Sequence, residues 1–282
     1  VILSRNEHKQ VDMERTFNNK KLKFIICDIR AYTSLKQAME GVDVVFHLAA
    51  MKHVHVCEAN SWQTVETNII GTQNVINAAI NTGVKLVVDI STDKAVEPHN
   101  IYGISKACGE KLMTNAQHNY DSSTNFVCVR AGNVVGTNGS IFPLFKKQIL
   151  QNNKITITDP EMTRFILKTG DAINLIFHAV ERSIGGETFV MKMPSTSVQT
   201  IADSMITYFG NKHTEVEIIG SRPGEKKHEK LLSSNEIKNS FEFDDKYFVI
   251  LPEINRKKNS AYHKLKTLDI SDYSSFKILV II

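Results

Sequence analysis

Short apolar runs alternate with longer segments of helical periodicity through the first half of the chain, and this alternation constrains the fold most. Four runs have the length and composition of buried strands, at residues 24–27, 44–48, 86–90 and 126–129. Between them, residues 63–82 and 102–117 carry apolar side chains at roughly a 3.6-residue period, which is typical of helices. Buried strands joined by helices form a parallel sheet that is covered on both faces. The sequence therefore predicts an α/β fold with a doubly wound parallel sheet.

The pattern changes in the second half of the chain. Helical and strand-like segments become shorter and mixed after about residue 140, and Pro143, Pro160, Pro194 and Pro223 interrupt them. We therefore expect residues 1–140 to form a large lobe and residues 141–282 mainly a smaller α/β lobe that closes over a substrate. The chain is expected to return to the large lobe near residues 165–182.

Composition excludes several classes of protein. Hydrophobic residues make up 42% of the 282 residues, enough for a sizeable core. The net charge of +4 is modest and no basic, aromatic cluster stands out, so nucleic-acid binding is not expected. The four cysteines form no CxxC pair, which argues against a metal site and suits a reducing cytosol. No apolar run approaches the ~20 residues of a membrane span, and no signal peptide is recognisable, so a cytoplasmic location is expected.

The residues after the third apolar run are candidates for chemistry, because parallel sheets bind ligands at the carboxyl ends of their strands. Ser-Thr-Asp-Lys follows at 91–94, and then Tyr102 and Lys106, which share one face of the next helix. A nearby ammonium lowers the pKa of a phenol, which gives a base for a sugar hydroxyl. A tyrosine and a lysine at this spacing are also common by chance on protein surfaces. The preceding strand and the loop with Pro98 favour the functional interpretation.

Asp93 and Lys94 form the more informative pair. Adjacent acid and amine groups at the end of a strand can be a plain surface ion pair. They can also face a substrate, where one group protonates a leaving hydroxyl while the other removes a carbon-bound proton. We favour the second interpretation.

Taken together, the motifs resemble the inverting UDP-N-acetylglucosamine 4,6-dehydratases of the extended short-chain dehydrogenase/reductase superfamily. The similar segments are Ser-Thr-Asp-Lys-Ala at 91–95, Tyr-Gly-Ile-Ser-Lys at 102–106, Ala-Ala-Met-Lys-His-Val at 49–54, Asn-Ile-Ile-Gly-Thr at 68–72, Gly-Asn-Val-Val-Gly at 132–136, Met-Thr-Arg-Phe at 162–165 and Arg-Pro-Gly-Glu-Lys at 222–226. The resemblance spans roughly residues 1–250. It implies a Rossmann-like sheet with a smaller α/β substrate-binding lobe.

The resemblance also implies a reaction. Tyr102 would deprotonate the hydroxyl on sugar carbon 4 while NADP takes hydride, and Lys106 would orient the cofactor ribose and depress the pKa of Tyr102. Lys94 would remove the proton on carbon 5, Asp93 would protonate the hydroxyl leaving carbon 6, and Thr92 would bond near the reacting hydroxyl. The product would be a UDP-4-keto-6-deoxy-hexosamine, inverted at carbon 5, for surface polysaccharide or glycan synthesis.

Binding residues are implied by the same resemblance. The cofactor would contact Ser4, Arg5, Asp28, Ile29, Ala49, Ala50 and Lys52, besides Tyr102 and Lys106. The UDP-sugar would contact Lys52, Asn133, Arg164, Arg222 and Glu225. Arg5 can pair with a 2′-phosphate, which favours NADP over NAD, although an exposed arginine without this role is the alternative. Lys52 and Arg164 can equally be structural ion-pair partners.

The sequence departs from this family at both ends. The first strand and its glycine-rich turn, whose backbone donors cradle the pyrophosphate, are missing before the segment that resembles residues 1–5. Without that strand the sheet would expose unpaired backbone groups, so this chain alone is expected to bind NADP poorly. Residues 276–282 match nothing in the family, and Ala131 replaces a more usual aromatic residue. A full-length form is expected to be a homo-oligomer.

Two other functions remain open. A UDP-sugar 4-epimerase would share Tyr102 and Lys106 but would need no acid/base pair for the loss of water. A truncated, non-catalytic relic that binds ligands is the other alternative, and the missing glycine-rich turn favours it. The intact set of Asp93, Lys94, Tyr102 and Lys106 argues against the relic.

Overall fold

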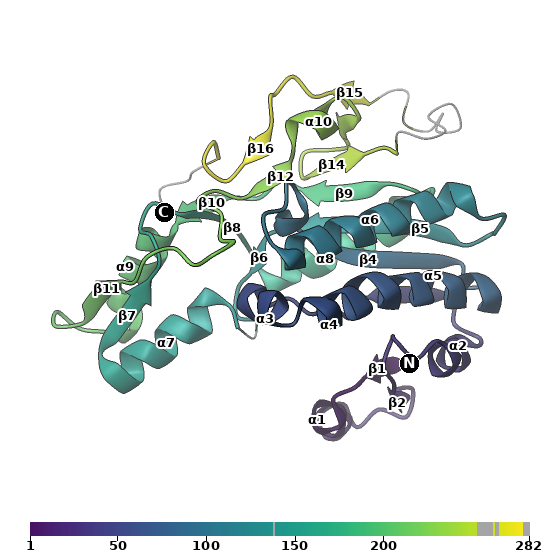
Figure 1. Cartoon of the computed structure of the whole chain (residues 1–282), viewed down its shortest axis with the longest axis horizontal. Helices are drawn as coiled ribbons and strands as arrows, with labels where there is room; N and C mark the ends of the chain where they lie inside the picture. The colour runs from purple at the N-terminus through teal and green to yellow at the C-terminus, as the bar shows by residue number, and fades with distance from the viewer. Residues whose placement is uncertain (138, 253–261, 263–264, 279–282) are drawn as a thin grey trace.

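The first half of the chain alternates strands and helices, as its sequence predicts (Figure 1). The structure is a computed structural model that describes residues 1–137, 139–252, 262 and 265–278. The elements of this half are β1 (Ile2–Ser4), α1 (Glu7–Phe17), β2 (Phe24–Ile26), α2 (Tyr32–Met39), β3 (Val44–His47), α3 (Val54–Ala59), α4 (Ser61–Val65), the π-helical turn η1 (Glu66–Ile70), α5 (Gly71–Thr82), β4 (Leu86–Thr92), the 3-10 turn η2 (Asp93–Ala95), α6 (Ile101–Asn119), β5 (Asn125–Ala131) and β6 (Asn133–Val134).

All four apolar runs form strands, and both predicted helices are present. The periodic segment 63–82 is one continuous helical stretch made of α4, η1 and α5, and the segment 102–117 lies inside α6. Helix α5 ends at Thr82, and the next residue, Gly83, adopts the left-handed backbone conformation (φ 70°) that glycine favours. Local periodicity was sufficient to place these elements.

The remaining elements belong to the second half of the chain. They are α7 (Ile141–Asn152), β7 (Lys154–Ile157), β8 (Thr163–Leu167), α8 (Thr169–Arg182), β9 (Thr188–Met191), β10 (Ser195–Ser197), α9 (Val198–Phe209), β11 (Glu215–Ile218), β12 (Lys230–Leu232), α10 (Ser234–Ile237), β13 (Ser240–Glu242), β14 (Tyr247–Ile250), β15 (Lys266–Thr267) and β16 (Tyr273–Ser274). Helices α7 and α9 enclose a small apolar core of their own, centred on Phe145, Ile155 and Ile201.

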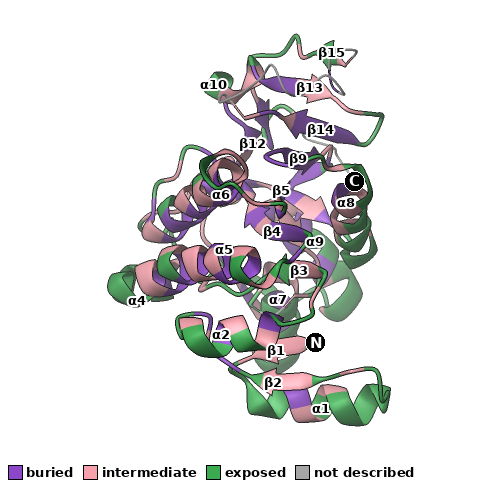
Figure 2. Ribbon diagram, turned by 90° about the vertical axis from the view of Figure 1, so that its right-hand side faces the viewer, coloured by how far each residue is buried: buried purple, intermediate pink, exposed green. Residues whose placement is uncertain are grey.

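The main sheet has seven strands in the order β15-β13-β14-β9-β5-β4-β3, and β3, β4, β5 and β9 run parallel. Alternate residues of β4 enter different cores: Val87 packs with Ile76 of α5 on one face, and Val88 packs with Leu175 of α8 on the other. Figure 2 shows α5 and α6 on one side of β4 and β5, and α8 on the opposite side. The predicted α/β, Rossmann-like parallel sheet covered on both faces is confirmed.

The chain re-enters the main sheet after the small lobe begins. Helix α8 packs against β4 and β5, and it overlaps the segment 165–182 that the sequence analysis expected to return to the large lobe. The same sheet also takes up β9 and then the antiparallel strands β14, β13 and β15, which the sequence analysis did not assign to it. The division into lobes at residue 140 stays a prediction.

Strands β1 and β2 form a separate two-stranded parallel sheet, which does not pair with the main sheet through any described residue. Figure 2 places them next to β3, with a space between β1 and β3. A pocket of about 1050 Å³ occupies this space and is lined by residues of both strands. Apolar side chains at its rim remain exposed, including Val1 (61%) and Leu48 (63%). Apolar surface therefore remains uncovered between β1 and β3.

Among the described residues, no helix has both the length and the apolar character required to cross a membrane.

Candidate active site

Three reactive side chains lie close together at the carboxyl end of β4. Thr92 ends the strand, and the chain then turns through η2, where the Thr92 hydroxyl accepts a hydrogen bond from the backbone N–H of Lys94. The same hydroxyl donates to Asp93 Oδ1 over 2.9 Å, and Lys94 Nζ donates to that oxygen over 3.0 Å. The Asp93 side chain is fully buried, whereas that of Lys94 is 22% exposed. The pair predicted from the sequence is therefore an ion pair whose acidic member is inaccessible to solvent and whose basic member is partly accessible.

Helix α6 positions the tyrosine and the second lysine. Asn100 caps its N-terminus by accepting a hydrogen bond from the backbone N–H of Gly103 over 2.8 Å. Tyr102 and Lys106 are both buried one turn apart, and the positive charges of Lys94 and Lys106 both act on the Tyr102 phenol. Tyr102, Thr92, Asp93 and Lys94 therefore belong to one cluster.

The expected lowering of the Tyr102 pKa is wrong for this structure. Burial is the largest influence and raises the pKa of Tyr102, and the opposing charges of Lys94 and Lys106 do not compensate for it. Lys106 is also engaged elsewhere, because its Nζ lies 3.3 Å from Oδ1 of the buried Asp89. Because the Asp89 carboxylate offsets the positive charge of Lys106, this lysine stabilises a Tyr102 phenolate less than an unpaired lysine would.

The close approach of α6 to η2 depends on Gly103. A Cβ atom at this position would lie 2.3 Å from the carbonyl oxygen of Lys94, which is backbone and cannot rotate away. We expect Gly103→Ala to displace the Asp93-Lys94 turn and to lower catalytic turnover at least tenfold. Gly170→Ala serves as the control, because no heavy atom lies within 4 Å of its Cβ position and its backbone is not in the left-handed region. Steady-state kinetics on both variants measures this. Equal turnover in the two variants would contradict the packing account.

The residues predicted to hold the cofactor fall into two groups. The pocket between β1 and β3 is lined by Ser4, Arg5, Asp28, Ile29, Ala49 and Ala50. Lys52, Tyr102 and Lys106 do not line it, and Lys52 is exposed between β3 and α3. Arg5 Nη1 lies 3.5 Å from Asp28 Oδ2, and hydrogen bonds from Arg30 hold the pKa of Asp28 at about 2. The first group therefore shares one pocket, and the residues lining it include no glycine that could approach the phosphates of a dinucleotide.

The predicted substrate residues come from three segments. Asn133 follows β5, and its side-chain Oδ1 is buried without a hydrogen-bond partner among the described residues. Arg164 in β8 acts electrostatically on Lys94, and its Nη1 donates to the carbonyl oxygen of Thr163 over 2.8 Å. Arg222 is exposed, and its backbone N–H donates to Glu225 Oε2 over 3.3 Å. The loop that carries Arg222 and Glu225 is held against the start of α6 by a hydrogen bond of 2.9 Å from Asn100 Nδ2 to the Gly224 carbonyl oxygen.

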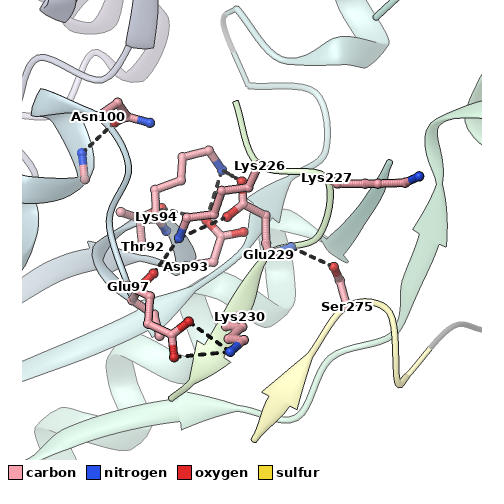
Figure 3. Close-up of polar contacts among 12 residues, drawn as sticks. Thr92, Asp93, Lys94, Glu97, Asn100, Lys226, Lys227, Glu229, Lys230 and Ser275 are labelled. Carbon is pink, nitrogen blue, oxygen red and sulfur yellow. Dashed lines mark hydrogen bonds and ion pairs between the residues drawn. The ribbon is translucent and has the colours of Figure 1, made fainter. Parts of the chain in front are cut away.

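Sequence reasoning missed two residues that complete the cluster. Glu229 and Lys226 lie beside Asp93 and Lys94, with Lys94 Nζ 3.6 Å from Glu229 Oε1 (Figure 3). Lys226 belongs to the Arg-Pro-Gly-Glu-Lys motif but was given no role, and Glu229 had no signal beyond its position three residues later. Asp89 did have a signal, because a charged residue that interrupts an apolar strand must find a partner when buried.

Comparison with protein families identifies one matching model. The model described as "Polysaccharide biosynthesis protein" matches residues 1–251. A protein named UDP-glucose 4-epimerase from Rickettsia rickettsii (strain Sheila Smith) is 41% identical over 277 residues, which cover 97% of this chain and 81% of the relative.

Solved structures agree with the fold. The X-ray structure of Pen from Bacillus thuringiensis superposes with a TM-score of 0.92 at 39% identity, covering 99% of this chain and 85% of that one. DesIV from Streptomyces venezuelae, a dTDP-glucose 4,6-dehydratase solved with NAD, gives a TM-score of 0.71 at 22% identity, covering 77% of this chain and 73% of that one. The second similarity concerns the fold alone.

Proposed function

This chain belongs to the polysaccharide biosynthesis protein family, and we propose that it is a nucleotide-sugar 4,6-dehydratase. We propose UDP-N-acetylglucosamine as its substrate and a UDP-4-keto-6-deoxy-hexosamine, inverted at carbon 5, as its product. The observation that carries the proposal is the Asp93-Lys94 pair, buried beside Tyr102 at the end of β4. Loss of water needs an acid and a base close together, and simple oxidation or epimerisation does not.

Each side chain has a role in this reaction. Tyr102, as the phenolate, takes the proton from the hydroxyl on carbon 4, and Thr92 holds that hydroxyl in place. The ammonium groups of Lys94 and Lys106 favour the phenolate, against the effect of burial. A nicotinamide cofactor, when bound, would supply the hydride acceptor for carbon 4 and, after loss of water, the hydride donor for carbon 6, so that it is not consumed. Lys94 then removes the proton on carbon 5, which the neighbouring keto group has made acidic, and Asp93 protonates the hydroxyl that leaves carbon 6. Asp93 Oδ2 suits this role, because it is buried and has no hydrogen-bond partner among the described residues.

The proposed acid and base together hold a single proton. We assign this proton to Lys94 before the reaction: burial opposes the charge of its amine, but the carboxylates of Asp93 and Glu229 outweigh burial and raise its pKa. Elimination needs the opposite arrangement, with a neutral Lys94 and a protonated Asp93. Transfer of the proton across the 3.0 Å hydrogen bond from Lys94 Nζ to Asp93 Oδ1 produces that state without any exchange with solvent.

We propose NADP as the cofactor, with Arg5 at the 2′-phosphate and Lys106 at the nicotinamide ribose. We also expect the 282-residue chain to bind it weakly, because the residues lining the pocket between β1 and β3 include no glycine whose backbone could approach the phosphates. Calorimetric titration of the purified 282-residue chain with NADP and, separately, with NAD measures this. Saturable binding at micromolar concentrations would show that the gap between β1 and β3 does not impair the cofactor site.

A UDP-sugar 4-epimerase is the second candidate, and the name of the 41% identical Rickettsia relative favours it. The two functions share Tyr102 and Lys106, so these residues do not distinguish them. Asp93 and Lys94 would be idle in an epimerase, which returns hydride to carbon 4 and removes no proton from carbon 5.

Product analysis separates the two candidates. The assay uses the chain extended before Val1 by a strand and a glycine-rich turn, with NADP and UDP-N-acetylglucosamine. The proposal expects a keto sugar nucleotide that is lighter than the substrate by one water. A 4-epimer of unchanged mass would reject the dehydratase and establish the epimerase.

A further inference from the structure

Lys94 lies between two buried carboxylates rather than beside one. Its Nζ is 3.0 Å from Asp93 Oδ1 and 3.6 Å from Glu229 Oε1, and both acidic side chains are almost completely buried. On its other side, Glu229 faces Lys226, whose Nζ is 4.0 Å from Glu229 Oε2. Figure 3 shows both lysine side chains converging on Glu229. Two acids and two amines thus alternate in one buried cluster with no net charge when all four are ionised.

The outer half of this cluster is fixed by the surrounding fold. The backbone N–H of Glu229 donates to Ser275 Oγ over 2.9 Å, and the Ser275 N–H donates back to the Glu229 carbonyl oxygen over 2.8 Å. Ser275 is fully buried, and its hydroxyl also bonds that of Thr163 over 2.7 Å. Lys226 Nζ donates to the carbonyl oxygen of Val96, just after η2. These anchors hold Glu229 and Lys226 against the Asp93-Lys94 turn.

We propose that Glu229 and Lys226 are positioning residues that determine whether Lys94 or Asp93 carries the proton they share. The carboxylate of Glu229 stabilises the ammonium form of Lys94 and keeps the amine next to Asp93. The ammonium of Lys226 offsets part of the Glu229 charge, which makes the neutral form of Lys94 easier to reach. The use made of this arrangement in elimination rests on the proposed dehydratase function, but the electrostatic coupling does not.

Other charged groups also face the cluster. Arg164 of β8 opposes the charge on Lys94, and Tyr102 of α6 stabilises it. Burial lowers the pKa of Lys226 from its usual value, and Lys94 lowers it further, while Glu229, Asp93 and Glu97 act in the opposite direction. Glu229 is the carboxylate that acts on both lysines and is not itself part of the proposed acid/base pair. Its removal therefore isolates the proposed coupling.

The coupling can be measured without cofactor or sugar. The purified 282-residue chain is prepared with ¹³C-labelled lysine, and the signals of Lys94 and Lys226 are assigned from Lys94→Met and Lys226→Met. Titration by NMR then compares the parent chain with Glu229→Gln. We expect the pKa of Lys226 to fall by about one unit or more. The pKa of Lys94, which is raised in the parent, should also fall, so that this lysine titrates at lower pH in Glu229→Gln than in the parent.

Two further variants serve as controls. Glu97→Gln removes the carboxylate that pairs with Lys230 at 2.9 Å. This variant tests whether losing any nearby acid has the same effect. It should change the pKa values of Lys94 and Lys226 clearly less than Glu229→Gln does. Glu229→Asp retains the charge and should preserve most of the parental titration. Unchanged titration of both lysines in Glu229→Gln would overturn the proposal, as would an equal change in Glu97→Gln. A failed dehydratase assay would affect neither result.

Discussion

Replacing Lys94 by Met should reduce the loss of water by about 10²- to 10⁴-fold, the usual contribution of a general base. The variant retains Tyr102 and Lys106, so oxidation at carbon 4 should continue and the reduced cofactor should accumulate. Oxidation should be slower than in the parent, because the ammonium of Lys94 also lowers the pKa of Tyr102. Lys94 Nζ also holds Asp93 by a 3.0 Å hydrogen bond, so the variant disturbs the acid as well as the base. Single-turnover kinetics of the extended chain, followed by cofactor absorbance and product mass, separates the two steps.

Lys230→Met provides a matched control for this variant. Lys230 lies four residues from Lys226 and binds Glu97 at the surface, with its side chain 29% exposed. The control should retain nearly parental turnover, because it removes an ammonium without touching Asp93. A Lys94→Met enzyme that still releases water at the parental rate would exclude Lys94 as the base. An enzyme that loses both steps equally would show that Lys94 acts before elimination, in substrate binding or on the Tyr102 phenol.

Replacing Arg130 by Met should lower the free energy of unfolding by about 3–5 kcal/mol, because it leaves two carboxylates without their cation. Arg130 is buried in β5, with Nη2 2.6 Å from Glu110 Oε2 and 2.9 Å from Glu236 Oε1. Its Nη1 also donates to the Leu231 carbonyl oxygen over 2.8 Å. Urea unfolding, with an unchanged dependence on urea concentration, measures the loss.

Lys192→Met is the control for the stability effect. Lys192 forms a partly exposed ion pair with Glu242 at 3.1 Å, and such pairs contribute about 0–1 kcal/mol. If Arg130→Met lowered the free energy of unfolding no more than the control does, the ion pairs of Arg130 with Glu110 and Glu236 would not stabilise the fold. Arg130 also matters for the candidate site, because it binds the carbonyl oxygen of Leu231, which lies two residues after Glu229 in the chain.

The sequence was sufficient for those parts of the fold that local patterns determine. The run around Val87 and the helix that carries Tyr102 could be predicted because burial and periodicity are encoded in consecutive residues. The place of β9, β13, β14 and β15 in the main sheet could not, because short strands give weak local signals and their partners are distant in the chain. Whether such a strand joins the main sheet, and in which direction it runs, is decided by tertiary packing rather than by local composition.

The candidate site divides in the same way. Asp93, Lys94, Tyr102 and Lys106 lie within 14 consecutive residues, so their spacing already indicated a shared cluster. Lys226, which reaches Val96 across a separation of 130 residues, could join them only through the fold. The sign of the shift in the pKa of Tyr102 depended on burial, which motif spacing does not report.

The reaction carried out in D₂O tests the central claim most directly, because it follows the proton that Lys94 is proposed to remove. With UDP-N-acetylglucosamine and the extended chain, we expect a product that has lost one water and carries one deuterium at carbon 5, seen by mass spectrometry and NMR. Solvent deuterium enters there because carbon 5 is deprotonated and then reprotonated during the cycle. A product of unchanged mass, epimerised at carbon 4 and free of deuterium, would contradict the role assigned to Asp93 and Lys94.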